Sequence, residues 1–63
     1  MAIGLRRLLE AARLLRFTDL TVQEVGRRAG FRDPLYFSRA FKRHQGEAPQ
    51  AYRARVQGKS MHP

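Results

Sequence analysis

The chain has 63 residues, no cysteine, and a formal net charge of +8 from 13 Lys and Arg against 5 Asp and Glu. This length allows one small domain, and the lack of cysteine excludes both disulfides and a cysteine-based zinc site. The two histidines, His44 and His62, lack the paired ligands of a zinc site, so we expect no metal and no cofactor. The positive charge describes either a solvated basic surface or, as we favour, a surface for nucleic acid.

No apolar run approaches the ~20 residues that a membrane-spanning helix needs. Residues 1–16 combine early arginines with leucines, as a signal peptide does. However, Glu10, Arg13 and Arg16 interrupt this run, and no small-residue cleavage site follows it. We therefore expect no membrane association and a cytoplasmic location.

The first predicted helix spans residues 5–16 and is amphipathic. Its apolar face carries residues at the spacing of one helical stripe, namely Leu5, Leu8, Ala12 and Leu15. Leu9 lies at the edge of this stripe. Leu14 points away from it, so this side chain either makes a second contact or is exposed.

The second predicted helix, residues 21–29, begins with a capping box. Thr21 and Glu24 have the T-x-x-E spacing in which each side chain accepts a hydrogen bond from the other residue's backbone N–H. Gly30 ends the helix, because glycine accepts a positive φ. Gly26 costs about 1 kcal/mol of helix propensity relative to alanine. We expect that it leaves room for a close crossing by the next helix.

The third predicted helix, residues 34–44, begins with Asp33 as its N-cap and has two different faces. The apolar face carries Phe37, Ala40, Phe41 and His44, and Phe31 from the preceding turn joins the core. The opposite face carries Leu35, Arg39 and Lys42, flanked by Ser38 and Arg43. For Tyr36, core packing and a hydroxyl contact to phosphate both remain open. His44 is interpreted as a packed or helix-capping residue and not as a catalytic one.

The last predicted helix spans residues 49–57, with Tyr52 and Val56 as its buried pair. Residues 58–63 carry no apolar pattern and are predicted to form a disordered tail. The expected fold is therefore all-α: a single domain over residues 1–57, forming a small homeodomain-like helix-turn-helix bundle of about four helices.

The capped helix, the glycine turn and the basic helix together have the outline of a helix-turn-helix. The same outline also fits a helical hairpin with a solvated charged face. An exposed Leu35 beside Arg39 and Lys42 favours DNA, because leucine can contact a thymine methyl and arginine can bind guanine O6 and N7. No nucleophile, base and acid occur together, so we do not expect an enzyme.

Two stretches, LLEAARLLRFTDLTVQEVGRRAGF and LYFSRAFKRHQGEAPQAYR, resemble the second half of the DNA-binding domain of AraC/XylS-family transcription regulators. Family members carry two helix-turn-helix units joined by a linker helix, and they insert two recognition helices into successive major grooves. The resemblance implies a linker-type helix at 5–16, a first helix at 21–29 and a recognition helix at 34–44. It implies double-stranded DNA as the partner, bound weakly by one unit alone.

The resemblance also implies roles for individual residues. Those expected to contact bases are Arg39, Leu35, Arg32 and Pro34, with Arg39 as the main reader. Those expected to contact the DNA backbone are Ser38, Lys42, Arg43 and Thr21. Two departures from the family pattern stand out: Ala48 replaces a Ser or Thr cap, and Pro34 replaces a polar residue, which weakens base reading there.

An alternative function is a protein-interaction or dimerisation module. In this hypothesis the apolar stripe of the first helix, with Leu9 and Leu14 exposed, binds a second copy of the chain or a partner such as RNA polymerase.

Overall fold

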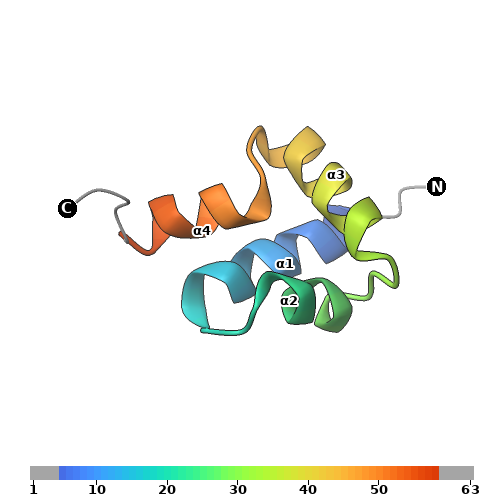
Figure 1. The fold of residues 1–63 in the computed structure, drawn as a ribbon, viewed down its shortest axis with the longest axis horizontal. Helices are drawn as coiled ribbons and strands as arrows, with labels where there is room; N and C mark the ends of the chain where they lie inside the picture. Colours follow the sequence, from blue (N-terminus) through green and yellow to red (C-terminus); the bar gives the residue numbers. More distant parts are fainter. Residues whose placement is uncertain (1–4, 59–63) are drawn as a thin grey trace.

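The computed structural model describes residues 5–58, and these form four α-helices and no strand. The helices are α1 (Leu5–Phe17), α2 (Val22–Arg28), α3 (Pro34–Gln45) and α4 (Pro49–Val56) (Figure 1). The predicted all-α class is confirmed. Within the described part of the chain, no helix is long and apolar enough to cross a bilayer.

The helix ends differ from the predicted ranges by one residue at several positions. α1 continues to Phe17, α3 continues to Gln45, and Gln57 is the C-cap of α4. Thr21 and Ala29 are likewise the caps of α2 and not members of it. Of the predicted tail, only Gly58 is described; residues 59–63 lie outside the described residues, as do residues 1–4 of the predicted domain.

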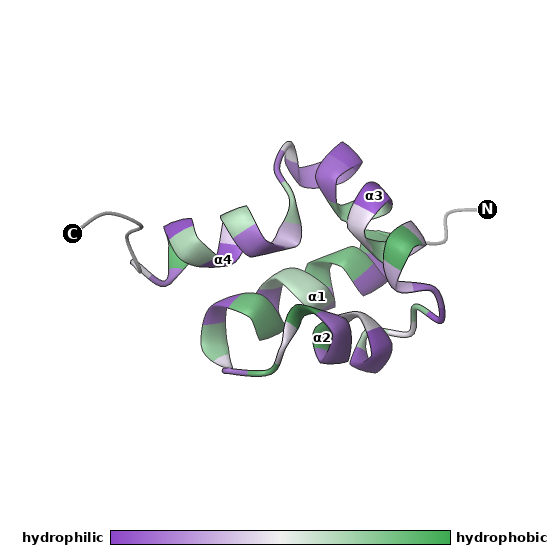
Figure 2. Ribbon diagram, viewed as in Figure 1, coloured by the Kyte–Doolittle hydropathy of each residue, from purple (hydrophilic) through white to green (hydrophobic). Residues whose placement is uncertain are grey.

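The helix α1 lies at the centre of the bundle and contacts the other three helices. In Figure 1, α2 lies below α1, while α3 and α4 lie above its two ends. In Figure 2, hydrophobic and hydrophilic colours alternate along α1, and purple covers much of α2 and the later turns of α3. This arrangement leaves the outer side of α3 free of other helices.

The buried core combines aliphatic residues of α1 and α2 with three phenylalanines. Its members are Leu8, Ala11, Ala12, Leu15, Val25, Ala29, Phe31, Phe37 and Phe41. Phe37 lies 5.1 Å from Phe31 and 5.8 Å from Phe41 between ring centroids, and Phe41 lies 5.3 Å from Tyr52. These tilted and edge-on contacts are the favourable geometry for aromatic pairs. The prediction that Phe31, Phe37 and Phe41 belong to the core is confirmed.

Some expectations about the apolar faces are wrong. Leu5 is 51% exposed, because it occupies the first position of α1, one turn before the first buried leucine. Of the two roles expected for His44, packing is wrong: the side chain is exposed, because it lies beyond Phe41. Its place in the last turn of α3 leaves the helix-capping role a prediction. Leu14, which the interaction hypothesis needed to be exposed, is half-buried against the core.

The C-terminus of α1 is closed by side chains from α4. Arg53 donates hydrogen bonds to the carbonyls of Leu15 and Thr18, each over 3.1 Å. Gln57 Nε2 also donates to these two carbonyls, over 2.8 and 3.1 Å. The guanidinium thus satisfies acceptors that a helix leaves unpaired and lies at the negative end of its dipole. These bonds connect residues 35 to 42 positions apart.

Candidate nucleic-acid interface

The start of α2 is held by the predicted capping box. Thr21 Oγ1 accepts a hydrogen bond from the Glu24 N–H, and Glu24 Oε1 accepts one from the Thr21 N–H, both over 3.1 Å. Two N–H groups that a helix start leaves unpaired are therefore satisfied locally. The prediction is confirmed, and the first helix of the pair has a defined beginning.

The turn after α2 is tight and uses glycine for its backbone. Gly30 has a φ of +100°, a conformation that side chains rarely adopt. The Phe31 N–H donates to the Gly26 carbonyl over 2.8 Å, and Arg7 Nη1 reaches the Gly30 carbonyl from α1 over 3.3 Å. Phe31 can therefore turn inward, where it is only 5% exposed.

α2 and α3 cross closely at Gly26. A Cβ at this position would lie 2.8 Å from Cδ2 of Phe37, a distance that real Cβ atoms essentially never show. The expected reason for a glycine inside this short helix is thereby confirmed. The contact sets the distance between α2 and α3, and hence the position of α3 on the surface.

The start of α3 is capped by Asp33. Its Oδ1 accepts a hydrogen bond from the Leu35 N–H over 3.0 Å, and Pro34 occupies the first helical position. Proline is favoured there because its missing N–H would have no intrahelical partner. At the other end, Gly46 adopts a φ of +87° and closes the helix. The helix is thus bounded on both sides by residues whose chemistry suits helix ends.

The outer face of α3 is formed by residues opposite the buried phenylalanines. Arg39 lies about 160° around the helix from both Phe37 and Phe41 by the helical repeat, and it is exposed. Leu35, on the same side, is 60% exposed and lies beside these basic residues. We use the term outer face below for Leu35, Arg39, Lys42 and Arg43.

The structure brings most of the sequence-predicted residues together around α3. Those exposed on this helix or its preceding turn are Arg32, Pro34, Leu35, Arg39, Lys42 and Arg43. Ser38 is half-buried, and Thr21 is exposed but lies on another element, at the start of α2. Tyr36 is 47% exposed and its ring lies 6.0 Å from that of Phe31, so part of it packs against the turn.

The acidic side chains that form ion pairs lie away from the outer face. Among the described residues these pairs are Glu10 with Arg13 on α1 and Glu47 with Arg55 on α4. The hydrogen bond from Arg13 is the main cause that lowers the pKa of Glu10 below its ordinary value of 4.5, helped by the opposite charge. α3 itself (PLYFSRAFKRHQ) contains no Asp or Glu, so the basic groups of the outer face are not neutralised by carboxylates of their own helix.

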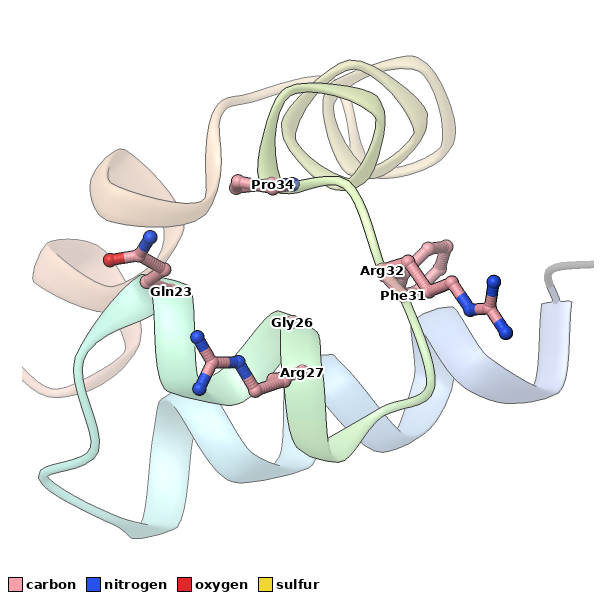
Figure 3. A pocket seen from close by; sticks show the side chains of 6 residues that line it. All are labelled: Gln23, Gly26, Arg27, Phe31, Arg32 and Pro34. Atoms are coloured by element: carbon pink, nitrogen blue, oxygen red, sulfur yellow. The ribbon is translucent and has the colours of Figure 1, made fainter.

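A small hollow between α2 and the start of α3 was not predicted. It has a volume of about 30 Å³ and is lined by Gln23, Gly26, Arg27, Phe31, Arg32 and Pro34 (Figure 3). The sequence carries one sign of it: Gln23 and Arg27 are spaced i, i+4 and flank Gly26, so both lie on the side of α2 that α3 crosses. No group of three or more His, Asp or Glu in residues 5–58 is arranged to hold a metal ion.

The exposed apolar side chains of α1 are Leu5, Leu9 and Phe17, of which Leu9 is 54% exposed. Of the two leucines that the interaction hypothesis expected to be exposed for a partner, Leu9 is exposed, whereas Leu14 packs against the core.

The chain is similar to regulatory proteins that are much longer. A family model described as a helix-turn-helix domain matches residues 2–55. The arabinose operon regulatory protein of Escherichia coli (strain K12) is 45% identical over 49 residues, which are 78% of this chain and 17% of that protein. The transcriptional activator NphR of a Rhodococcus species is 49% identical over 47 residues, 75% of this chain and 14% of that protein.

A third relative, the HTH-type transcriptional activator RhaR of Enterobacter sp. (strain 638), is 45% identical over 49 residues, 78% of this chain and 17% of that protein. The chain thus spans less than a fifth of the length of these three relatives. No solved structure matches the chain significantly.

Proposed function

We propose that this chain, which belongs to the AraC/XylS-type helix-turn-helix family of transcription regulators, binds double-stranded DNA with α3 in the major groove. The observation that carries the proposal is the outer face of α3. An exposed leucine and three exposed cations lie together on the side of the helix opposite its buried phenylalanines. A major groove accepts one α-helix and presents both donor and acceptor groups and thymine methyls.

Arg39 is the principal base reader in this proposal. Its position opposite the core directs it furthest from the bundle, and a guanidinium can bind guanine O6 and N7 with two hydrogen bonds. Leu35 contacts a thymine methyl one turn earlier. Arg32 and Pro34 lie at the start of the helix, where Arg32 offers hydrogen bonds and Pro34, which has no N–H, offers only apolar contact.

The backbone contacts come from residues at the edges of this surface. Lys42 and Arg43 are exposed cations near the end of α3, and Ser38, one turn before Lys42, is half-buried. The Thr21 hydroxyl accepts a bond within the capping box, which leaves its proton available to a phosphate oxygen. With about 4–6 such contacts, the log–log dependence of affinity on salt should have a slope of about −4 to −5. We expect the 63-residue chain alone to bind weakly and with little sequence preference.

Fluorescence anisotropy with labelled duplexes tests this proposal. Two duplexes are chosen from a randomised pool, one that binds tightly and one that binds weakly, and both are titrated at several salt concentrations. Arg39→Ala should reduce the ratio between the two affinities by about 5- to 160-fold, the range for loss of one two-bond base contact. Because the ratio cannot fall below one, a smaller starting ratio should collapse to about one.

Lys42→Ala is the matched control, because it removes a charge from the same face. It should weaken binding to both duplexes equally and reduce the magnitude of the salt slope by about 0.9, the value for one phosphate contact. Failure of the unmodified chain to bind at low salt, or binding that ignores salt, would contradict the proposed function.

A further inference from the structure

The hollow between α2 and α3 brings two hydrogen-bond donors of α2 beside the first residue of α3. In Figure 3 the guanidinium of Arg27 extends toward the side of Gln23, and Pro34 lies across the hollow from both, whereas Arg32 points outward in another direction. Gln23 and Arg27 are both exposed. An amide N–H₂ and a guanidinium on one side of a hollow are groups that donate hydrogen bonds to an anionic oxygen.

The size of the hollow limits what can occupy it. Sites for small molecules usually have volumes of about 300–1,000 Å³, whereas this hollow has about 30 Å³. A cavity needs about 10–15 Å³ of such volume to hold one water-sized group. The hollow therefore has room for an oxygen atom of a larger group that stays outside, and it is far smaller than the usual site of a small-molecule effector.

The first turn of α3 offers an anion few donors of its own. Pro34 has no N–H, and the Leu35 N–H already donates to Asp33 Oδ1 over 3.0 Å. The Phe37 N–H donates to the Asp33 carbonyl over 2.9 Å, as the helix requires. Among the described residues, the Tyr36 N–H is the one backbone donor of this turn without an acceptor, so an anion beside this helix start depends mainly on the side chains of α2.

The charge of Arg27 is available for such a contact. Within residues 5–58, no carboxylate oxygen lies within ion-pair distance of its guanidinium. Glu24, the acid of α2, directs Oε1 to the Thr21 N–H in the capping box. The hollow is thus basic and not internally neutralised.

The hollow also adjoins the proposed DNA surface. Pro34, Ser38 and Lys42 follow one another at i, i+4 spacing, so they form one line along α3 that starts at the hollow. Lys42 at the end of this line belongs to the outer face. A DNA strand that passes along this edge of α3 therefore runs over the hollow as it leaves the groove.

From these observations we infer that the hollow seats one phosphate oxygen of the bound DNA strand, held by the Arg27 guanidinium and the Gln23 amide. This inference rests on the proposed function and extends it to α2, which the sequence analysis connected to DNA only through Thr21. A contact of this kind carries no sequence information itself; it sets the position of α3 in the groove.

The test compares two arginines of the same helix. Arg27→Ala and Arg28→Ala remove the same charge from neighbouring positions. Arg28 does not line the hollow: it lies about 100° further around α2, by a surface formed with Leu14 and Asp19. In anisotropy titrations of the full 63-residue chain, Arg27→Ala should weaken binding about fivefold to every duplex and reduce the magnitude of the salt slope by about 0.9. Arg28→Ala should weaken binding less than twofold.

Duplexes in which single phosphates are replaced by neutral methylphosphonates locate the contact. At one position the methylphosphonate should weaken binding of the unmodified chain but leave the affinity of Arg27→Ala unchanged. At the same position, the methylphosphonate should weaken binding of Gln23→Ala less than it weakens binding of the unmodified chain. Equal effects of Arg27→Ala and Arg28→Ala, or the absence of any such position, would overturn the phosphate seat while the proposed function stands. If the unmodified chain binds no duplex at low salt, the proposed function fails and the inference fails with it.

Discussion

The two halves of this small bundle are held together in different ways. The unit of α2, the turn and α3 relies on local devices: the capping box, the Asp33 cap and the positive φ of Gly30 each act within a few residues. The pair of α1 and α4 relies on hydrogen bonds from Arg53 and Gln57 that span 35 to 42 positions. The first half fixes the orientation of α3, and the second holds α4 on the end of α1.

The difference is clearest at the starts of α3 and α4. Both helices have proline at the first position, but α3 has a capping carboxylate whereas Ala48 before α4 provides no side-chain bond. The only buried residue of α4 is Pro49, and Tyr52 is half-buried against the core. The position of α4 in the bundle therefore depends strongly on its polar contacts with α1. α3 depends less on polar contacts, because it is held by two buried phenylalanines.

Removal of the Phe41 side chain should destabilise both halves of the bundle together. It is fully buried and contacts Phe37 on one side and Tyr52 on the other. Phe41→Ala should cost about 3–5 kcal/mol, against a total stability of about 3–9 kcal/mol for a chain of this length. We expect the variant to lose its cooperative thermal transition, followed by circular dichroism at 222 nm. Phe17→Ala, at a position 68% exposed, is the control and should melt as the unmodified chain does.

Arg53→Met should weaken the α1–α4 half selectively. Methionine keeps much of the apolar stem but leaves two carbonyl groups without this donor, so the variant should lose about 2 kcal/mol in urea unfolding. Hydrogen exchange should show faster exchange of α4 amides than of α3 amides. Arg55→Met, which breaks an exposed pair with Glu47, should leave the urea midpoint almost unchanged, because exposed ion pairs contribute little to stability. Equal losses in the two variants would argue against the special role of Arg53.

Ala48→Ser should sharpen the comparison by giving α4 the cap that it lacks. Ala48 already has the extended backbone of an N-cap: its φ of −65° and ψ of 156° lie within a few degrees of those of Thr21. A serine hydroxyl there should add about 1 kcal/mol of stability, read from the urea midpoint. The reverse change, Thr21→Ala, should lower the stability by a similar amount. If Ala48→Ser left the urea midpoint unchanged, the missing cap would not be what limits the stability of α4.

The smallest expected effect concerns Glu10 and Arg13, on the exposed side of α1. The hydrogen bond from Arg13 lowers the pKa of Glu10 in the folded chain, so below 4.5 the unfolded chain binds more protons. The pair's contribution should thus be present above pH 4.5 and lost as pH falls through the lowered pKa. In urea unfolding at a series of pH values, Glu10→Gln should differ slightly from the unmodified chain near pH 6, and the difference should shrink below pH 4.5. A difference that grows on acidification would contradict this sign.

Much of the helix-turn-helix half could be predicted from the sequence. T-x-x-E spacing indicated the cap of α2, Asp-Pro indicated the start of α3, and the phenylalanine spacing indicated its buried face. Gly26 was interpreted as the site of a close crossing, which the 2.8 Å approach of Phe37 confirms. The DNA-contacting roles of the outer face stay predictions, although the residues proposed for base contacts lie together around α3.

The expectations that failed concern residues whose environment is set by neighbouring helices. Leu5 and His44 lie on apolar faces by their spacing, yet each occupies a helix end that extends past the core. Ala11 lies outside the predicted stripe of α1 and is fully buried, because α1 is central and is covered from more than one side. A periodic pattern identifies a face of a helix, but it does not say how far along that face the neighbours reach.

The sequence by itself determined the elements of this protein: where its helices start and stop, which turn needs a glycine, and which side of α3 is basic. These features act over three or four residues, so local residue types suffice to specify them. Only the tertiary structure decided that Arg53 and Gln57 close the end of α1, and that Gln23 and Arg27 meet Pro34 across a small hollow. Such contacts depend on the angle and distance at which helices cross, which the packing of Gly26, Phe37 and Phe41 sets for the chain as a whole.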